Sequence, residues 1–167
     1  MKLDLREIME EGGGSLPFSF EVTADGLVFS GVDEFTAPVV FSGRVENHAG
    51  TFTVTGELDS QMACTCGRCL KHFVKPLHIP VRVYLAEELQ DEDSEDIYLL
   101  SEGRFCDLDE IGMEALVLNM EQRQLCSEDC KGLCPKCGKN LNDGPCNCGE
   151  DRDPRLAVLW QLLENDE

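Results

Sequence analysis

Apolar and polar residues alternate through the first half of the chain. Phe18, Phe20 and Val22 share one parity, and Leu27 and Phe29 continue the alternation. A period of two places the apolar side chains on one face of a β-strand. The sequence therefore predicts that this region is built mainly of strands with one buried face.

The strongest pairing signal is a hairpin around the turn Asn47 to Gly50. Two alternating arms flank this turn, and their apolar members are Val39, Phe41 and Val45 before it and Phe52, Val54 and Leu58 after it. The second arm runs on towards Cys64, and a tight turn over Cys66 to Cys69 leads into a further strand over Val74 to Leu85. Strands joined by such short turns predict an antiparallel β-meander.

Helical spacing occurs at three places. Leu3 to Glu10 predicts a short helix, and Asp107 to about Met120 predicts a central helix with acids in its first turn. A terminal helix is expected after Asp153, which can cap it, with Pro154 in the first helical position. Its apolar stripe, interpreted as core packing, consists of Leu156, Leu159, Trp160 and Leu163. A short strand is expected around Ile97.

Together these elements predict an α+β protein. It comprises an antiparallel β-meander in the N-terminal region, a central helix, a cysteine-rich zinc-binding segment and a C-terminal helix. We divide the chain into a β-rich core with its following helix, 1–122, and a zinc-binding segment with the terminal helix, 123–167. The length of 167 residues suits a domain of about 100 residues with a small metal-stapled appendage.

The charge is strongly negative: 33 acidic residues face 14 basic ones, which gives −19. Residues 86–114 form an acidic belt with twelve acids and one base, whereas residues 123–155 carry six of each. The belt, with Gln90 to Asp96 as a loop, is expected either to be simply solvated or to suit a basic protein partner. Because the whole chain does not attract phosphates at long range, RNA contact is expected only at residues of the balanced stretch. These are Lys131, Lys136, Lys139, Arg152 and Arg155.

The sequence also predicts the cellular compartment. No apolar run approaches the roughly 20 residues that span a bilayer, and the start MKLDLREIMEE has acids where a signal peptide needs an apolar stretch. We therefore expect a cytoplasmic protein without membrane contact. In a reducing compartment, ten cysteines indicate metal or redox chemistry rather than disulfides.

Six cysteines gather near the C-terminus, at 126, 130, 134, 137, 146 and 148. The two-residue spacing in Cys134-Pro135-Lys136-Cys137 lets both thiolates reach one ion, and Gly138 permits the chain reversal of a zinc knuckle. We predict one structural Zn²⁺, with iron as the competing metal. Its ligands are expected to be Cys134, Cys137, Cys146 and Cys148, with Cys126 or Cys130 as alternates. No histidine lies nearby in the sequence, which favours a closed site over a catalytic one.

A second candidate thiol site is the pair Cys66 and Cys69. Three interpretations stay open: a half-site that binds metal together with Cys126 or Cys130, a redox pair, or thiols packed at a turn between strands. Redox chemistry of the thioredoxin type needs the first thiol at a helix N-terminus, and the flanking residues here predict strands. Cys106, a lone thiol, is expected to pack in the core.

Three motifs in order resemble the YceD-like family, the large ribosomal RNA subunit accumulation proteins. They are CGRCL at Cys66 to Leu70, the acidic-start helix from Asp107 to Asn119, and CKGLCPKCGKNLN followed by CNCG and DPRLAVLWQL. The resemblance implies a non-enzymatic protein needed for normal levels of 23S ribosomal RNA. It also implies that zinc supports the fold rather than a shared reaction.

We therefore expect a ribosome biogenesis factor that binds ribosomal RNA or a basic large-subunit ribosomal protein. Two alternatives belong to other classes. One is a thiol-dependent redox enzyme that uses Cys66 and Cys69, and the other is a zinc-ribbon adaptor for transcription. The sequence does not reveal the oligomeric state.

Overall fold

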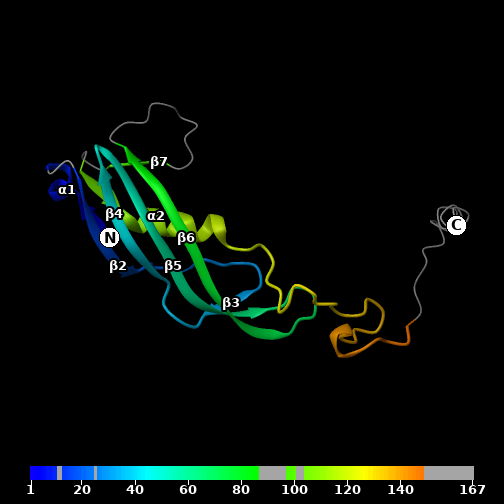
Figure 1. Cartoon of the computed structure of the whole chain (residues 1–167). Helices are drawn as coiled ribbons and strands as arrows, with labels where there is room; N and C mark the ends of the chain where they lie inside the picture. The colour runs from blue at the N-terminus through cyan, green and yellow to red at the C-terminus, as the bar shows by residue number, and fades with distance from the viewer. Residues whose placement is uncertain (11–12, 25, 87–96, 101–103, 149–167) are drawn as a thin grey trace, which may run out of the picture.

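The computed structural model describes residues 1–10, 13–24, 26–86, 97–100 and 104–148 of the chain. Among these residues the fold is α+β, as the sequence predicts, with a six-stranded sheet and one long helix (Figure 1). The strand order is β2-β4-β5-β6-β7, and β3 pairs with β5 outside this path. The strands are β2 (Gly13–Glu21), β3 (Val32–Phe35), β4 (Val40–His48), β5 (Thr51–Thr65), β6 (His72–Ala86) and β7 (Ile97–Leu99).

The β4–β5 hairpin has the predicted position and register. Val45 lies opposite Val54, and the connecting residues Ala49 and Gly50 have φ values of 53° and 91°. Positive φ at both central residues is typical of the hairpin turn whose twist matches that of the strands. The Asn47 carboxamide oxygen accepts a hydrogen bond from the Gly50 N–H at 2.8 Å, which closes the turn. Among the described strands, only β7 runs parallel to its neighbour, β6.

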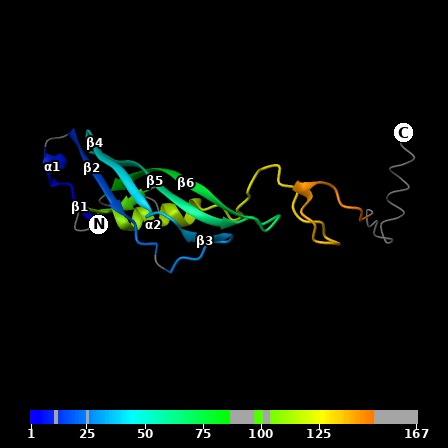
Figure 2. The same cartoon turned by 90° about the horizontal axis from the view of Figure 1, so that it is seen from below.

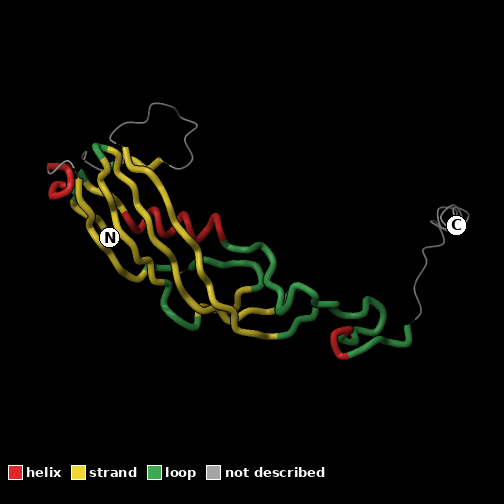
Figure 3. The backbone as a smooth tube through the Cα atoms, in the orientation of Figure 1, coloured by secondary structure: helices red, strands yellow, loops and turns green. Residues whose placement is uncertain are grey.

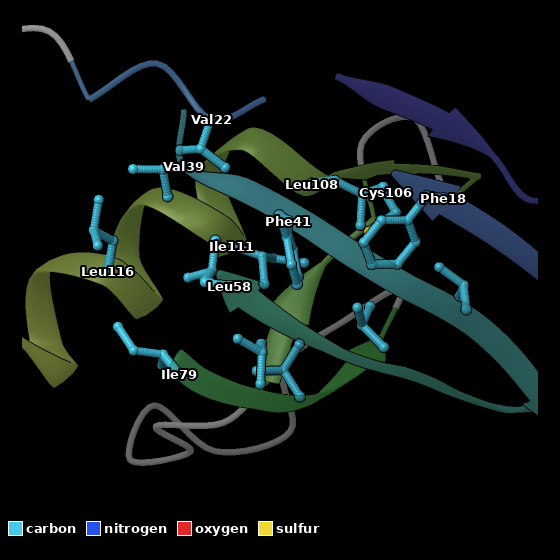
Figure 4. Packing of buried hydrophobic residues seen from close by; sticks show 14 of the residues in the cluster. Phe18, Val22, Val39, Phe41, Leu58, Ile79, Cys106, Leu108, Ile111 and Leu116 are labelled. Atoms are coloured by element: carbon cyan, nitrogen blue, oxygen red, sulfur yellow. The ribbon is translucent and has the colours of Figure 1, made fainter. Parts of the chain in front are cut away.

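The core lies between one face of the sheet and the helix α2 (Leu108–Asn119) (Figure 2). Phe41 and Leu58 of the sheet and Ile111 of the helix are fully buried, and their side chains point towards one another (Figure 4). The Asp107 carboxylate caps the helix by accepting a hydrogen bond from the Asp109 N–H at 3.2 Å. The predicted central helix is confirmed, as is the predicted burial of alternate apolar side chains along β4 and β5.

Two predictions near the N-terminus are wrong. The residues Lys2–Asp4 form strand β1, paired with β8 (Phe105–Asp107), and only Arg6–Glu10 forms the helix α1. Leu3 lies opposite Cys106 in this pair, so a long-range pairing overrides the local helical spacing. Leu27 and Phe29 lie in a loop before β3, although both pack partly against the core.

The β5–β6 hairpin is much longer than its neighbours. Both strands have 15 residues, whereas β2 and β4 have nine each. The far end of β5 also pairs with β3, and the tip of the hairpin leads towards the cysteine-rich segment (Figure 3). The tip is the predicted turn over Cys66 to Cys69. The fold therefore places this turn far along the sheet from α1 and β1.

The predicted terminal helix lies outside the described residues, and the division at residue 122 stays a prediction. None of the described helices is long and apolar enough to cross a membrane.

Candidate metal centres

The structure gathers eight cysteines into two groups of four. The hairpin group consists of Cys66, Cys69, Cys126 and Cys130, and the terminal group consists of Cys134, Cys137, Cys146 and Cys148. Within each group the four sulfur atoms lie within 4.8 Å of one another. A third cluster among the described residues, formed by Glu57, Asp59 and His78, is exposed on the sheet. No histidine joins either cysteine group in the described part of the chain.

The hairpin group is built on a knuckle at the tip of the β5–β6 hairpin. The Leu70 N–H donates to the Cys66 carbonyl at 3.0 Å, and the Cys66 N–H donates to the Lys71 carbonyl at 2.9 Å. Leu70 has a φ of 58°, in the left-handed region. These contacts turn the chain sharply, so that the Cys66 and Cys69 thiols face the same point.

The terminal group repeats the same construction in another part of the chain. The Gly138 N–H donates to the Cys134 carbonyl at 2.9 Å, and the Cys134 N–H donates to the Lys139 carbonyl at 2.8 Å. Gly138 has a φ of 71°, which corresponds to the φ of Leu70. This is the reversal that the sequence predicts at Gly138. The two groups therefore begin with knuckles that have the same backbone hydrogen bonds.

The sulfur spacing of the hairpin group fits a tetrahedral metal. The Sγ atoms of Cys66 and Cys130 are 3.8 Å apart, and those of Cys69 and Cys126 are 3.6 Å apart. A tetrahedral Zn²⁺ with bonds of about 2.3 Å to sulfur spaces its ligands about 3.8 Å apart, whereas a disulfide requires about 2.05 Å. All ten cysteines are free thiols. Both groups can hold a metal ion, and four thiol donors suit Zn²⁺.

Ionisation is unevenly distributed within the hairpin group. Burial disfavours the Cys66 thiolate, but backbone hydrogen bonds from Cys126 and Cys69 outweigh burial and lower the pKa of Cys66 to about 6. Hydrogen bonding to the Cys69 thiol raises the pKa of Cys126 to about 12. The side-chain amide of Asn142 lowers the pKa of Cys130. One thiol thus ionises easily while its neighbour resists ionisation.

The terminal group shows the same division. Backbone hydrogen bonds from Cys137 and Lys136 lower the pKa of Cys134 to about 6. Hydrogen bonding to the Cys137 thiol raises the pKa of Cys148 to about 12. Negative charge cannot spread over four adjacent thiols without a counterion, and a divalent cation removes this conflict because it favours the thiolate at every ligand.

The cysteine-rich segment is attached to the hairpin tip by several backbone contacts. The Gly67 N–H donates to the Gln124 carbonyl at 2.9 Å, and the Leu133 N–H donates to the Arg68 carbonyl at 3.1 Å. The Arg68 guanidinium donates through Nη1 to the carbonyls of Glu128 and Cys130, at 3.1 Å and 3.0 Å. Arg68 therefore holds the segment in place, so its guanidinium has a role that the sequence alone did not reveal.

The expected ligand set of the terminal group is brought together, and Cys126 and Cys130 lie with the hairpin thiols rather than in that set. Of the three interpretations of Cys66 and Cys69, the geometry matches the shared half-site, and it uses both Cys126 and Cys130. In the sequence this group is marked by two short cysteine spacings. Two residues lie between Cys66 and Cys69, three lie between Cys126 and Cys130, and 56 residues separate the two pairs.

The predicted contact residues are only partly described. Lys131, Lys136 and Lys139 are exposed, and the Lys139 ammonium donates to the Pro145 carbonyl at 2.8 Å. Arg152 and Arg155 lie outside the described residues. The contact face that these five side chains were expected to form therefore stays a prediction.

With this geometry established, the chain can be compared with known proteins. The family model "Large ribosomal RNA subunit accumulation protein YceD" matches residues 54–163, more than half of the chain. The chain belongs to the YceD family. The matched region contains the whole of β6 and α2 and all eight clustered cysteines. The resemblance inferred from three motifs is therefore confirmed.

Similar proteins occur in bacteria and in a plant. The chain is 33% identical over 127 residues to the uncharacterised protein Rv2926c of Mycobacterium tuberculosis, a match that covers 72% of this chain and 59% of that protein. It is 26% identical over 140 residues to ML1660 of Mycobacterium leprae, covering 81% and 64%. A 41-residue stretch is 46% identical to "Large ribosomal RNA subunit accumulation protein YCED homolog 1, chloroplastic" of Arabidopsis thaliana, covering 24% and 13%.

The chain thus spans about 59% of the length of the first curated relatives that it matches. No solved structure matches the chain significantly.

Proposed function

We propose that this YceD-family chain is a non-enzymatic factor in ribosome biogenesis that supports the accumulation of large-subunit 23S ribosomal RNA. We further propose that it holds structural Zn²⁺ in both cysteine groups and acts in the cytoplasm. One observation carries the proposal: the family model covers the region that contains both groups. The reducing conditions of the cytosol would keep the thiols available for metal.

Structural rather than catalytic zinc is supported by the donor sets. Each group offers four thiols, which fill a tetrahedral coordination sphere and leave no position for water or substrate. Bound Zn²⁺ would supply a cross-link between segments, because Cys66 and Cys69 follow β5 while Cys126 and Cys130 follow α2. Residues 121–148 contain no strand and only a short 3₁₀ helix, so they have little apolar packing of their own.

The preferred partner is a basic protein of the large subunit rather than the RNA backbone. Residues 121–148 carry four bases and four acids, and Arg68 and Lys71 add two bases nearby. A zinc ion with four thiolates has a net charge of about −2. Two such centres therefore carry more negative charge than the positive charge that Arg68 and Lys71 add. The segment that was expected to contact RNA is then slightly negative, and the net charge of the chain is −19.

The function is tested in the organism that carries the chain. Its removal should lower the ratio of 23S to 16S ribosomal RNA, and the wild-type chain should restore the ratio. A chain with Cys69→Ser and Cys134→Ser should fail to restore it, whereas Cys106→Ala, at a cysteine outside both groups, should succeed. An unchanged ratio after removal of the chain would contradict the proposal.

The partner is tested separately by crosslinking in the complemented cells. We expect the wild-type chain to crosslink to one basic large-subunit protein, and the crosslink should weaken as salt screens the charges. Crosslinks to 23S RNA that persist after protein digestion would instead favour direct RNA binding.

A further inference from the structure

The two cysteine groups are adjacent in the sequence. Only the three residues 131–133 separate Cys130 of the hairpin group from Cys134 of the terminal group. The loop between Cys137 and Cys146 contains a short 3₁₀ helix, Leu141–Asp143. At the centre of this helix lies Asn142, an asparagine in the terminal group's loop that contacts the hairpin group.

The Asn142 carboxamide bridges the two groups. Its oxygen Oδ1 accepts a hydrogen bond from the Lys131 N–H at 2.8 Å. Its nitrogen Nδ2 donates to the Cys130 sulfur at 3.4 Å and to Asn140 Oδ1 at 2.8 Å. A backbone N–H can only donate, so the Lys131 contact requires the oxygen on that side. The amide nitrogen must then face Cys130.

The loop that carries Asn142 is fastened to the stretch between the groups. The Leu141 N–H donates to the Gly132 carbonyl at 2.9 Å, and Leu133 and Asn140 form an isolated β-bridge. The ends of this loop are Cys137 and Cys146, which are both in the terminal group. A metal that binds both ends closes the loop and lowers the entropy cost of holding Asn142 in place.

We propose that Asn142 couples the two groups, so that a metal in the terminal group strengthens metal binding by the hairpin group. The inference rests on the proposed zinc sites. An N–H donor to a ligand sulfur stabilises the thiolate form and orients it towards the metal, and such outer contacts typically change metal affinity by about 10–100-fold. Asn142 is thus a positioning residue. Loss of the terminal metal therefore weakens metal binding by the hairpin group without abolishing it.

The test measures the affinity of each group in the full-length reduced chain. Cadmium-113 NMR resolves the two sites, and titration with a competing chelator gives the dissociation constant of Cd²⁺ at each. Asn142→Ala should weaken Cd²⁺ binding at the hairpin group about tenfold. Because coupling between two sites is reciprocal, it should weaken the terminal group by a similar factor when the hairpin group is filled, and leave the terminal group nearly unchanged when the hairpin group is empty. The matched control is Asn147→Ala, an asparagine between two ligands of the terminal group, which should leave the hairpin group unchanged.

A double-mutant cycle separates coupling from simple contact. Cys137→Ser, which removes a terminal ligand, should weaken the hairpin group about tenfold when Asn142 is present and have no further effect in the Asn142→Ala chain. Asn142→Asp keeps the oxygen that accepts from Lys131 but loses the donor to Cys130, so it should weaken the hairpin group as well. If Asn142→Asp binds like the wild type, the contact serves only loop packing and the coupling is wrong.

The remaining outcomes separate this inference from the proposed function. Two sites that fill independently, with Cys137→Ser silent at the hairpin group, would overturn the coupling alone. A wild-type chain that binds no metal at the hairpin group would overturn both.

Discussion

The hairpin and terminal cysteine groups share a knuckle but differ in their surroundings. In the hairpin group, Cys66, Cys69 and Cys130 are buried, and Phe73 and Leu133 are among the side chains packed against them. In the terminal group only Cys134 is buried, and Cys137 is exposed. The hairpin group therefore packs against the end of the sheet, whereas the terminal group lies near the surface. We infer that the hairpin group attaches the segment and that the terminal group shapes it.

The two knuckles also differ at one backbone position. Leu70 and Gly138 occupy equivalent places with nearly equal positive φ, 58° and 71°. Such a conformation costs a residue with a side chain roughly 1–2 kcal/mol and costs glycine almost nothing. The hairpin knuckle tolerates this strain because β5 and β6 fix both of its ends.

The largest expected difference between the groups concerns attachment of the segment. Cys130→Ser removes a ligand of the hairpin group and should release residues 121–148 from the hairpin tip. Cys137→Ser removes a ligand of the terminal group and should loosen only residues 134–148 at saturating Zn²⁺. Loss of a structural metal costs about 4 kcal/mol or more. Hydrogen exchange resolved by peptide checks this prediction.

The control for this pair is β4, whose amides should stay protected in both variants. Equal loss of protection over 121–133 in the two variants would contradict the separate roles of the groups.

A second difference should be seen when a chelator removes metal slowly. The terminal metal should leave first, because Cys137 is exposed and three of the hairpin thiols are buried. Native mass spectrometry after timed chelator addition should therefore show a one-metal species, and alkylation of that species should label the terminal cysteines. A one-metal species labelled at Cys66 and Cys69 would reverse the comparison.

The third prediction concerns the two positive-φ positions. Gly138→Ala should destabilise the zinc-loaded chain by about 1 kcal/mol, because alanine resists this backbone conformation. Leu70→Gly should change stability by less, since the relief of strain is offset by the greater freedom of glycine in the unfolded chain. Urea unfolding at fixed free Zn²⁺ checks both variants. A larger loss for Leu70→Gly would show that the leucine side chain contributes packing to the hairpin group.

The smallest effect lies on the exposed face of the hairpin, outside both groups. The Asp59 carboxylate accepts a hydrogen bond from His78 at 2.8 Å and raises the pKa of His78 above its ordinary value of 6.5. A raised pKa gives a stabilisation that is complete below the unfolded pKa and is lost as pH rises through the folded pKa. Asp59→Asn should lower the pKa of His78 in an NMR titration and leave both cysteine groups unaffected. An unchanged pKa would mean that this contact does not persist in solution.

The sequence could predict the strands and the terminal knuckle because their signals are local. Alternation from Val39 to Leu58 runs through two adjacent strands joined by a tight turn, and the spacing Cys134 to Cys137 lies within one knuckle. The hairpin group stayed one of several interpretations, because Cys66 and Cys126 lie far apart in the chain. In addition, the positive-φ position of its knuckle is occupied by Leu70 and not by glycine, so the sequence does not indicate the turn. Strand β1 was missed for the same reason, because its partner β8 follows about a hundred residues later.

If each group holds one zinc ion through four sulfurs, zinc X-ray absorption on the purified chain, together with its measured metal content, should show this. We expect two zinc ions per chain, each with four sulfur neighbours at about 2.3 Å and no nitrogen or oxygen ligand. One zinc per chain, or a coordination shell with a light-atom ligand, would contradict it.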